Sequence, residues 1–152
     1  MEPLARLLTR ERVLVELLLF KLVELKQLLL AGETRFLGWA SEEVDRATDA
    51  VRLTELERGV LVDEIGEARG IVDATLTSLI VDAPEPWQGI LQQDHEALSR
   101  SAGEISDLLQ VTRRLAEAGA RSIAESLGTV PLQAPTPYGT ERQATSRVQR
   151  IL

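Results

Sequence analysis

Apolar residues recur at alternating spacings of four and three along the first thirty positions of the chain. Only Glu11 interrupts this series, which consists of Leu4, Leu8, Val15, Leu18, Leu22, Leu25 and Leu29. Such heptad spacing is typical of a helix that packs lengthwise against other helices. A second apolar set widens the stripe at Leu7, Leu14, Leu17 and Leu28. We therefore predict a helix from about Pro3 to Ala31 that contacts two neighbours.

A membrane-spanning helix is the main alternative for so apolar a stretch, and its charges argue against it. Glu16, Lys21, Glu24 and Lys26 all lie between Val13 and Ala31. A charge near the centre of a bilayer costs roughly 2.5–3.5 kcal/mol. The same charges interrupt the apolar region that a secretory signal needs. We expect a helix buried within protein, and no integral membrane segment.

A second helix is predicted from near Thr34 to about Ala68. Gly32 is a suitable C-terminal cap for the first helix because glycine accepts the left-handed conformation. Arg58 alone breaks the second heptad series, which runs through Leu37, Ala40, Val44, Ala47, Val51, Thr54, Leu61 and Ile65. The short connection predicts an antiparallel pair of helices.

The sequence after the second helix predicts a short connector and then a third long helix. Gly66 and Gly70 weaken the second helix, and a short apolar turn at Leu76, Leu79 and Ile80 follows, with Asp73 as its predicted N-cap. Pro84 and Pro86 end that turn. The last helix is predicted from near Pro86 to Leu127–Gly128, with heptad positions at Leu91, Leu98, Ala102, Ile105, Leu109, Thr112, Ala116 and Ile123.

These elements predict an all-α fold, an elongated antiparallel bundle of three long helices with a short connecting helix. Residues 1–128 are expected to form the bundle domain. Residues 129–152 are expected to form a flexible C-terminal tail, because Pro131, Pro135 and Pro137 occur within seven positions there. Trp39 and Trp87 are expected to pack, respectively, the end of the helical hairpin and the start of the last helix against the bundle.

Composition excludes several kinds of chemistry. The chain of 152 residues has no cysteine, a single histidine and a formal charge of −7. The charge argues against nucleic acid as a partner, since phosphate contacts require basic clusters. His95 is expected to be a half-exposed surface residue, and no nucleophile, phosphate-binding or metal-ligand motif accompanies it. One histidine and no cysteine leave few catalytic groups, so an enzyme built in a helical bundle is the least supported hypothesis.

Several segments together resemble a known family. The first helix contains "LVELLLFKLVELKQLLLAGE" and leads at once into "RFLGWASEEVDRA". The short "ATLTSLI" follows, then "APEPWQGIL" opens the last helix, which ends in "VTRRLAEAGARSIAESLG" before a Tyr-Gly tail. This layout resembles the FlgN-like flagellar export chaperones, in the form found in high-GC Gram-positive bacteria.

The resemblance implies a cytoplasmic chaperone of flagellar type III export that is not an enzyme and uses no cofactor. Such a protein binds the C-terminal helices of hook-associated (hook–filament junction) proteins, prevents their aggregation and delivers them to the export gate. The family's client contacts are attributed to the last helix, where the matching apolar residues are Leu108, Leu109, Val111, Leu115, Ile123 and Leu127. A late tyrosine is implicated in docking to the export gate, and Tyr138 is the tyrosine that matches it.

The width of the apolar stripes supports a binding role independently of the resemblance. An apolar stripe that is wider than one neighbouring helix can cover leaves apolar surface exposed. An amphipathic helix of another protein could bind to that surface. The same surplus surface could instead be covered by a second copy of the chain. A self-associating structural coiled coil, present as a homodimer and without a secreted client, is therefore the alternative hypothesis.

Overall fold

A computed structural model of the chain describes residues 1–128, which form four α-helices and one 3₁₀ turn. The elements in order are α1 (Glu2–Ala31), η1 (Thr34–Phe36), α2 (Leu37–Arg69), α3 (Leu76–Asp82) and α4 (Trp87–Gly128). This confirms the predicted all-α fold of three long helices and a short connecting one. Residues 129–152, including Tyr138, lie outside the described residues.

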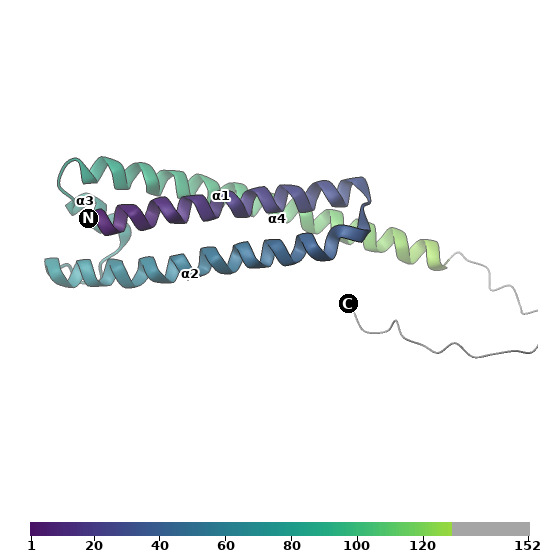
Figure 1. The fold of residues 1–152 in the computed structure, drawn as a ribbon, viewed down its shortest axis with the longest axis horizontal. Coiled ribbons are helices and arrows are strands. Elements are labelled where there is room, and N and C mark those ends of the chain that lie inside the picture. The colour runs from purple at the N-terminus through teal and green to yellow at the C-terminus, as the bar shows by residue number, and fades with distance from the viewer. Residues whose placement is uncertain (129–152) are drawn as a thin grey trace, which may run out of the picture.

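The long helices lie side by side, and each runs antiparallel to the previous one, so that α1 and α4 are parallel (Figure 1). Helix α1 packs against both α2 and α4. Within residues 1–128, in contrast, no Cα atom of α2 lies within 8 Å of one in α4. Helix α1 is therefore the central helix, and α2 and α4 are separated from each other along their length.

Two glycines end the helices of the hairpin in the left-handed conformation. Gly32 has φ 69° and ends α1, as predicted, while Gly70 has φ 70° and ends α2. Gly66 does not interrupt α2, contrary to the weakening expected from sequence. It is buried there, and a Cβ atom at this position would lie 2.3 Å from the Cβ of Ala74. Gly66 thus lets the connector after α2 lie close against the helix.

The predicted N-cap of α3 is wrong. Thr75, rather than Asp73, caps the helix: its Oγ1 accepts a hydrogen bond from the Ser78 N–H, and the Ser78 hydroxyl oxygen accepts one from the Thr75 N–H. Asp73 lies two residues too early and has φ 51°, a conformation that aspartate tolerates better than most residues. The helix is thus capped by two hydroxyl groups, each accepting a hydrogen bond from the backbone N–H of the other residue, and not by the carboxylate of Asp73.

The core consists of two apolar clusters at successive levels of the bundle. The first surrounds α3 and contains Leu4, Ala5, Leu8, Val62, Leu76, Leu79, Ile80, Ala83 and Leu91. Trp87 packs against this cluster, as predicted for the start of the last helix. The second cluster lies nearer the hairpin turn and contains Val15, Leu18, Leu22, Ala47 and Val51.

A polar layer separates the two clusters, and it is built from the residues that interrupt the heptad series. Arg58 Nε donates a hydrogen bond of 2.9 Å to Glu11 Oε2, and the Glu11 side chain is almost fully buried. The neighbouring Arg12 Nη1 donates one of 2.7 Å to the buried Asp94 Oδ1. Adjacent residues of α1 thus connect that helix to α2 and to α4.

Trp39 lies beside α1 at the hairpin end, where it lines a hollow with Val23 and Leu28. It is not buried there, however, so the prediction that it packs into the bundle is wrong. Its side chain is 68 % exposed, and its ring lies beside that of Phe36, with a centroid separation of 5.9 Å. Ala40 and Val44 take the inward-facing positions of the first turns of α2. Since successive residues are separated by about 100° around a helix, Trp39 points away from the core.

Candidate functional site

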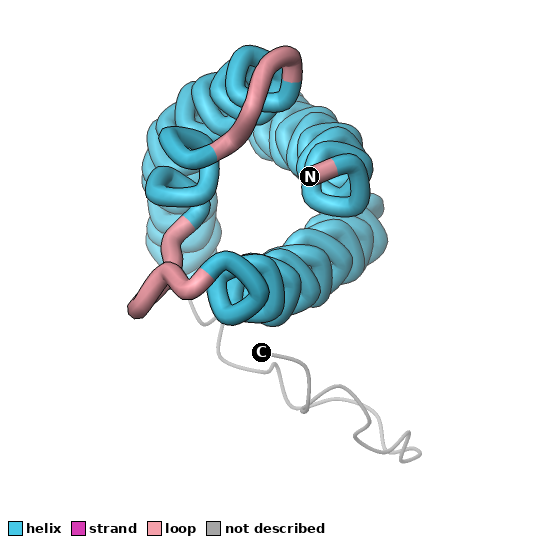
Figure 2. The backbone as a smooth tube through the Cα atoms, turned by 90° about the vertical axis from the view of Figure 1, so that its left-hand side faces the viewer, coloured by secondary structure: helices cyan, strands magenta, loops and turns pink. Residues whose placement is uncertain are grey.

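The short helix α3 fills the space between α2 and α4 at one end of the bundle. It lies on the side opposite α1, so that the four helices surround a common centre at that end (Figure 2). Leu76, Leu79 and Ile80 are its buried residues, and they belong to the first apolar cluster. This end of the molecule is therefore a closed four-helix layer.

Beyond α3 the same side of the bundle is open. A groove with a volume of about 460 Å³ lies between α2 and α4, and we call it the α2–α4 groove. Its lining comes from all four helices: Glu11, Val15 and Leu18 of α1, Thr48, Val51, Arg52, Glu55 and Arg58 of α2, Leu76 of α3, and His95, Leu98, Ser99, Ala102 and Ile105 of α4. The groove is the continuation of the position that α3 occupies, without a helix in it.

The chemistry of the α2–α4 groove suits an amphipathic helix. Val15 and Leu18 lie on the α1 side, and Val51, Leu98 and Ile105 add apolar surface from the walls. Charged side chains of both signs, those of Arg52, Glu55 and Arg58, line the α2 wall. An amphipathic helix binds such a groove by placing its apolar stripe on the apolar surface and its polar residues at the rim.

Burial shifts the pKa of one carboxyl group that lines the groove. Desolvation raises the pKa of Glu11 above its ordinary value of 4.5, and the positive charge and hydrogen bond of Arg58 oppose that rise. His95, half-buried on the α4 side, also lines the groove, in agreement with its predicted half-exposed position.

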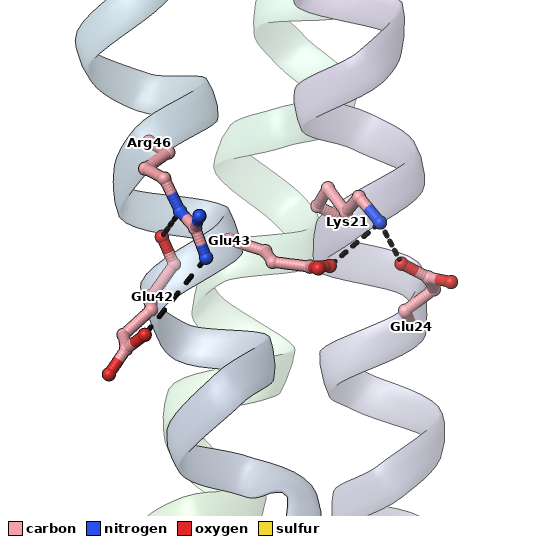
Figure 3. Close-up of polar contacts among 5 residues, drawn as sticks. All are labelled: Lys21, Glu24, Glu42, Glu43 and Arg46. Carbon is pink, nitrogen blue, oxygen red and sulfur yellow. Dashed lines mark hydrogen bonds and ion pairs between the residues drawn. The ribbon is translucent and has the colours of Figure 1, made fainter.

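The α2 wall is fixed to α1 near the hairpin turn by a lysine with two carboxylate partners. Lys21 Nζ lies 2.8 Å from Glu24 Oε2 in its own helix and 2.8 Å from Glu43 Oε2 in α2 (Figure 3). The hydrogen bonds to Glu24 and then Glu43 raise the pKa of Lys21, and the bond from Lys21 lowers the pKa of Glu43. These contacts link the two helices at the open end of the groove.

The last turns of α4 project past the hairpin (Figure 1). Because Arg12 pairs with Asp94 and the parallel helices rise about 1.5 Å per residue, the end of α1 lies level with roughly Arg113, and α4 continues for roughly 20 Å beyond it. Ile123 and Leu127 in this projection are exposed. The projecting part therefore carries apolar side chains that no other described helix covers.

The residues predicted to bind a client divide between two faces of α4. Leu109, Ile123 and Leu127 follow in helical steps from Leu98 and Ile105, which line the α2–α4 groove. Leu109 is 48 % exposed. Leu108, Val111 and Leu115 lie toward the other side of the helix. Leu108 packs against the second apolar cluster and Leu115 is half-buried, whereas Val111 is exposed.

Leu108 and Val111 belong to a second hollow, which we call the α1–α4 groove. It has a volume of about 540 Å³ and is lined by Glu16, Leu19, Phe20, Val23 and Lys26 of α1 and by Glu104, Asp107, Leu108 and Val111 of α4. On the same outer side of α1, Val13, Leu17 and Leu30 are also exposed. Helix α1 is thus apolar on its core side and on its outer side, and the described helices cover only the first.

Sequence reasoning assigned Val15, Leu18 and Val51 to the core and did not identify them as part of a groove. The signal that could have revealed it is the length of the connecting helix. Seven residues of α3 span roughly 10 Å, whereas α2 and α4, with 33 and 42 residues, each span roughly 50–60 Å. So short a helix can close only one end of the space between two long helices.

Within residues 1–128 there is no group of three or more histidine, aspartate or glutamate side chains placed to hold a metal ion. No helix of that part of the chain combines the length and the apolarity needed to cross a membrane.

No protein-family model, curated protein or solved structure matches the chain.

Proposed function

We propose that this chain is a chaperone that binds an amphipathic helix of a client protein in the α2–α4 groove. The proposal rests on one observation: the space between α2 and α4 is filled by a helix at one end of the bundle and is empty along the rest. Helix α3 closes that space at one end, and beyond α3 apolar residues of all three long helices line an unfilled groove. A client helix in the groove would complete a four-helix arrangement along the bundle.

The layout of the sequence supports a particular client class. Its resemblance to the FlgN-like chaperones suggests that the clients are the C-terminal helices of hook-associated flagellar proteins. On this proposal the protein acts in the cytoplasm, keeps those helices from aggregating, and delivers the client to the export gate. Tyr138, which lies outside the described residues, is the proposed contact with the gate.

The projecting part of α4 supports an extended client site. Leu109 continues the line of groove residues along α4, and Ile123 and Leu127 extend it past the hairpin, where α4 has no partner among the described helices. A client helix longer than the groove could contact these residues as well. This would account for a helix that is about ten residues longer than either of its neighbours.

A charge on the groove side of α4 should weaken client binding. We expect Leu109→Glu and Ala102→Glu each to reduce affinity for a fragment containing the C-terminal helices of a hook-associated protein by roughly ten- to a hundredfold, the equivalent of one lost buried apolar side chain. Ala102 lines the groove and is exposed, so its substitution leaves the core intact. Titration calorimetry at fixed salt measures the change.

Leu56→Glu is the matched control, because Leu56 is 69 % exposed on α2 and does not line the α2–α4 groove. It should leave affinity within about twofold. If all three variants lost the same amount of affinity for the fragment, the α2–α4 groove would not be the client-binding site. A stable homodimer in light scattering, with no affinity for the client fragment, would favour the self-associating coiled coil instead.

A further inference from the structure

The α1–α4 groove combines an apolar floor with an acidic rim. Leu19, Phe20 and Val23 supply apolar surface, while the charged lining consists of three carboxylates, those of Glu16, Glu104 and Asp107, and the single ammonium group of Lys26. Within residues 1–128, none of these three carboxylates has an ion-pair partner. The groove therefore matches a segment that is apolar and basic.

The last twelve residues of this chain have that chemistry. The segment 141–152 contains Arg142, Arg147 and Arg150 but only one acidic side chain, that of Glu141. It also contains three large aliphatic residues, Val148, Ile151 and Leu152. Three basic groups and one acidic group thus complement a groove with three acidic groups and one basic group.

The chain is long enough to bring this segment to the groove. Asp107 lies 21 residues before Gly128, the last residue of α4, which corresponds to roughly 30 Å of helix. The twelve residues between Gly128 and Glu141 can span at most roughly 40 Å. The segment can therefore turn back along α4 and reach the groove within the same molecule.

We propose that residues 141–152 dock in the α1–α4 groove of their own chain. The arginines face the carboxylates of the rim, and the aliphatic side chains cover Phe20 and Val23. This contact lies on a different side of α1 from the α2–α4 groove, because the two grooves share no residue of that helix. It therefore covers part of the apolar outer surface of α1 while the proposed client site stays open, and it does not depend on the proposed function.

Disulfide trapping in the full chain tests this contact, because the natural sequence contains no cysteine. One variant combines Gln149→Cys with Val23→Cys in the α1–α4 groove. The matched control combines Gln149→Cys with Ser99→Cys, which places the second thiol in the α2–α4 groove. We expect the first pair to form a disulfide within the monomer at least tenfold faster than the second under the same mild oxidant.

Charge substitutions test the basis of the contact. Arg147→Glu with Arg150→Glu should slow trapping of the Val23 pair severalfold, and adding Glu104→Lys with Asp107→Lys should restore most of the rate. Equal rates for the two cysteine pairs, faster trapping at Ser99, or disulfides mainly between molecules would each overturn the proposal. Because no client is present, these outcomes are independent of client binding.

Discussion

Replacing Arg58 with methionine should lower the free energy of unfolding by about 3–5 kcal/mol at pH 7, the typical effect of removing one partner of a buried ion pair. Arg58 is the hydrogen-bond partner of the buried Glu11, and the pair lies between the two apolar clusters. Methionine keeps much of the apolar volume of the arginine stem but leaves the Glu11 carboxylate without a counter-charge. Urea unfolding followed by circular dichroism measures the change.

The effect of this substitution should depend on pH. Without Arg58, burial raises the pKa of Glu11 still further above its ordinary value of 4.5. The folded state then keeps a proton that the unfolded state releases, so stability falls as pH rises above 4.5 toward the folded pKa. The difference in stability between the natural protein and Arg58→Met should therefore be smaller at pH 4.5 than at pH 7.

Two further variants isolate the pair. Arg52→Met, on the same helix but exposed, should change stability by less than about 0.5 kcal/mol. Combining Arg58→Met with Glu11→Gln should recover a large part of the loss at pH 7, because no buried charge remains. A loss below about 1 kcal/mol, or one that does not vary with pH, would show that Glu11 does not rely on Arg58.

Replacing Leu79 with alanine should lower the free energy of unfolding by about 2–5 kcal/mol, as for other fully buried leucines. Leu79 is 0 % exposed and belongs to the cluster that joins α3 to α1, α2 and α4. A cavity here removes contacts by which α3 closes its end of the bundle. Chemical unfolding gives the loss, and hydrogen exchange over residues 76–82 should also increase.

Val81→Ala is the control within the same helix, since Val81 is 72 % exposed. It should change stability by no more than about 0.5 kcal/mol. If the two alanine variants were equally stable, α3 would not be packed between α2 and α4 as the structure has it. The groove beyond α3 would then no longer be a continuation of a filled helix position.

The fold was predictable from the sequence because its determinants are local. Heptad spacing identifies the long helices, and Gly32 identifies the hairpin turn, since both depend on residues close together in the chain. The pairing of Glu11 with Arg58 was not predictable, although each was recognised as an interruption. It joins residues 47 positions apart, and only the register of α1 against α2 brings them together.

The candidate site was predictable only in part, for a related reason. The heptad pattern shows which residues face other helices, but it does not show whether another helix is present to cover them. Val15 and Val51 are at heptad positions, are almost fully buried, and still line the α2–α4 groove. Trp39 illustrates the opposite case, because its size suggested burial while its position on α2 turned it outward.

Methyl NMR of the protein during titration with a client fragment is the most direct test of a helix-binding groove between α2 and α4. The fragment should contain the C-terminal helices of a hook-associated protein. The account predicts a one-to-one complex and large shift changes at the groove methyl groups of Val15, Leu18, Val51, Leu98 and Ile105. Saturating fragment that leaves these signals unchanged, or that shifts only Val13 and Leu17 on the outer side of α1, would contradict it.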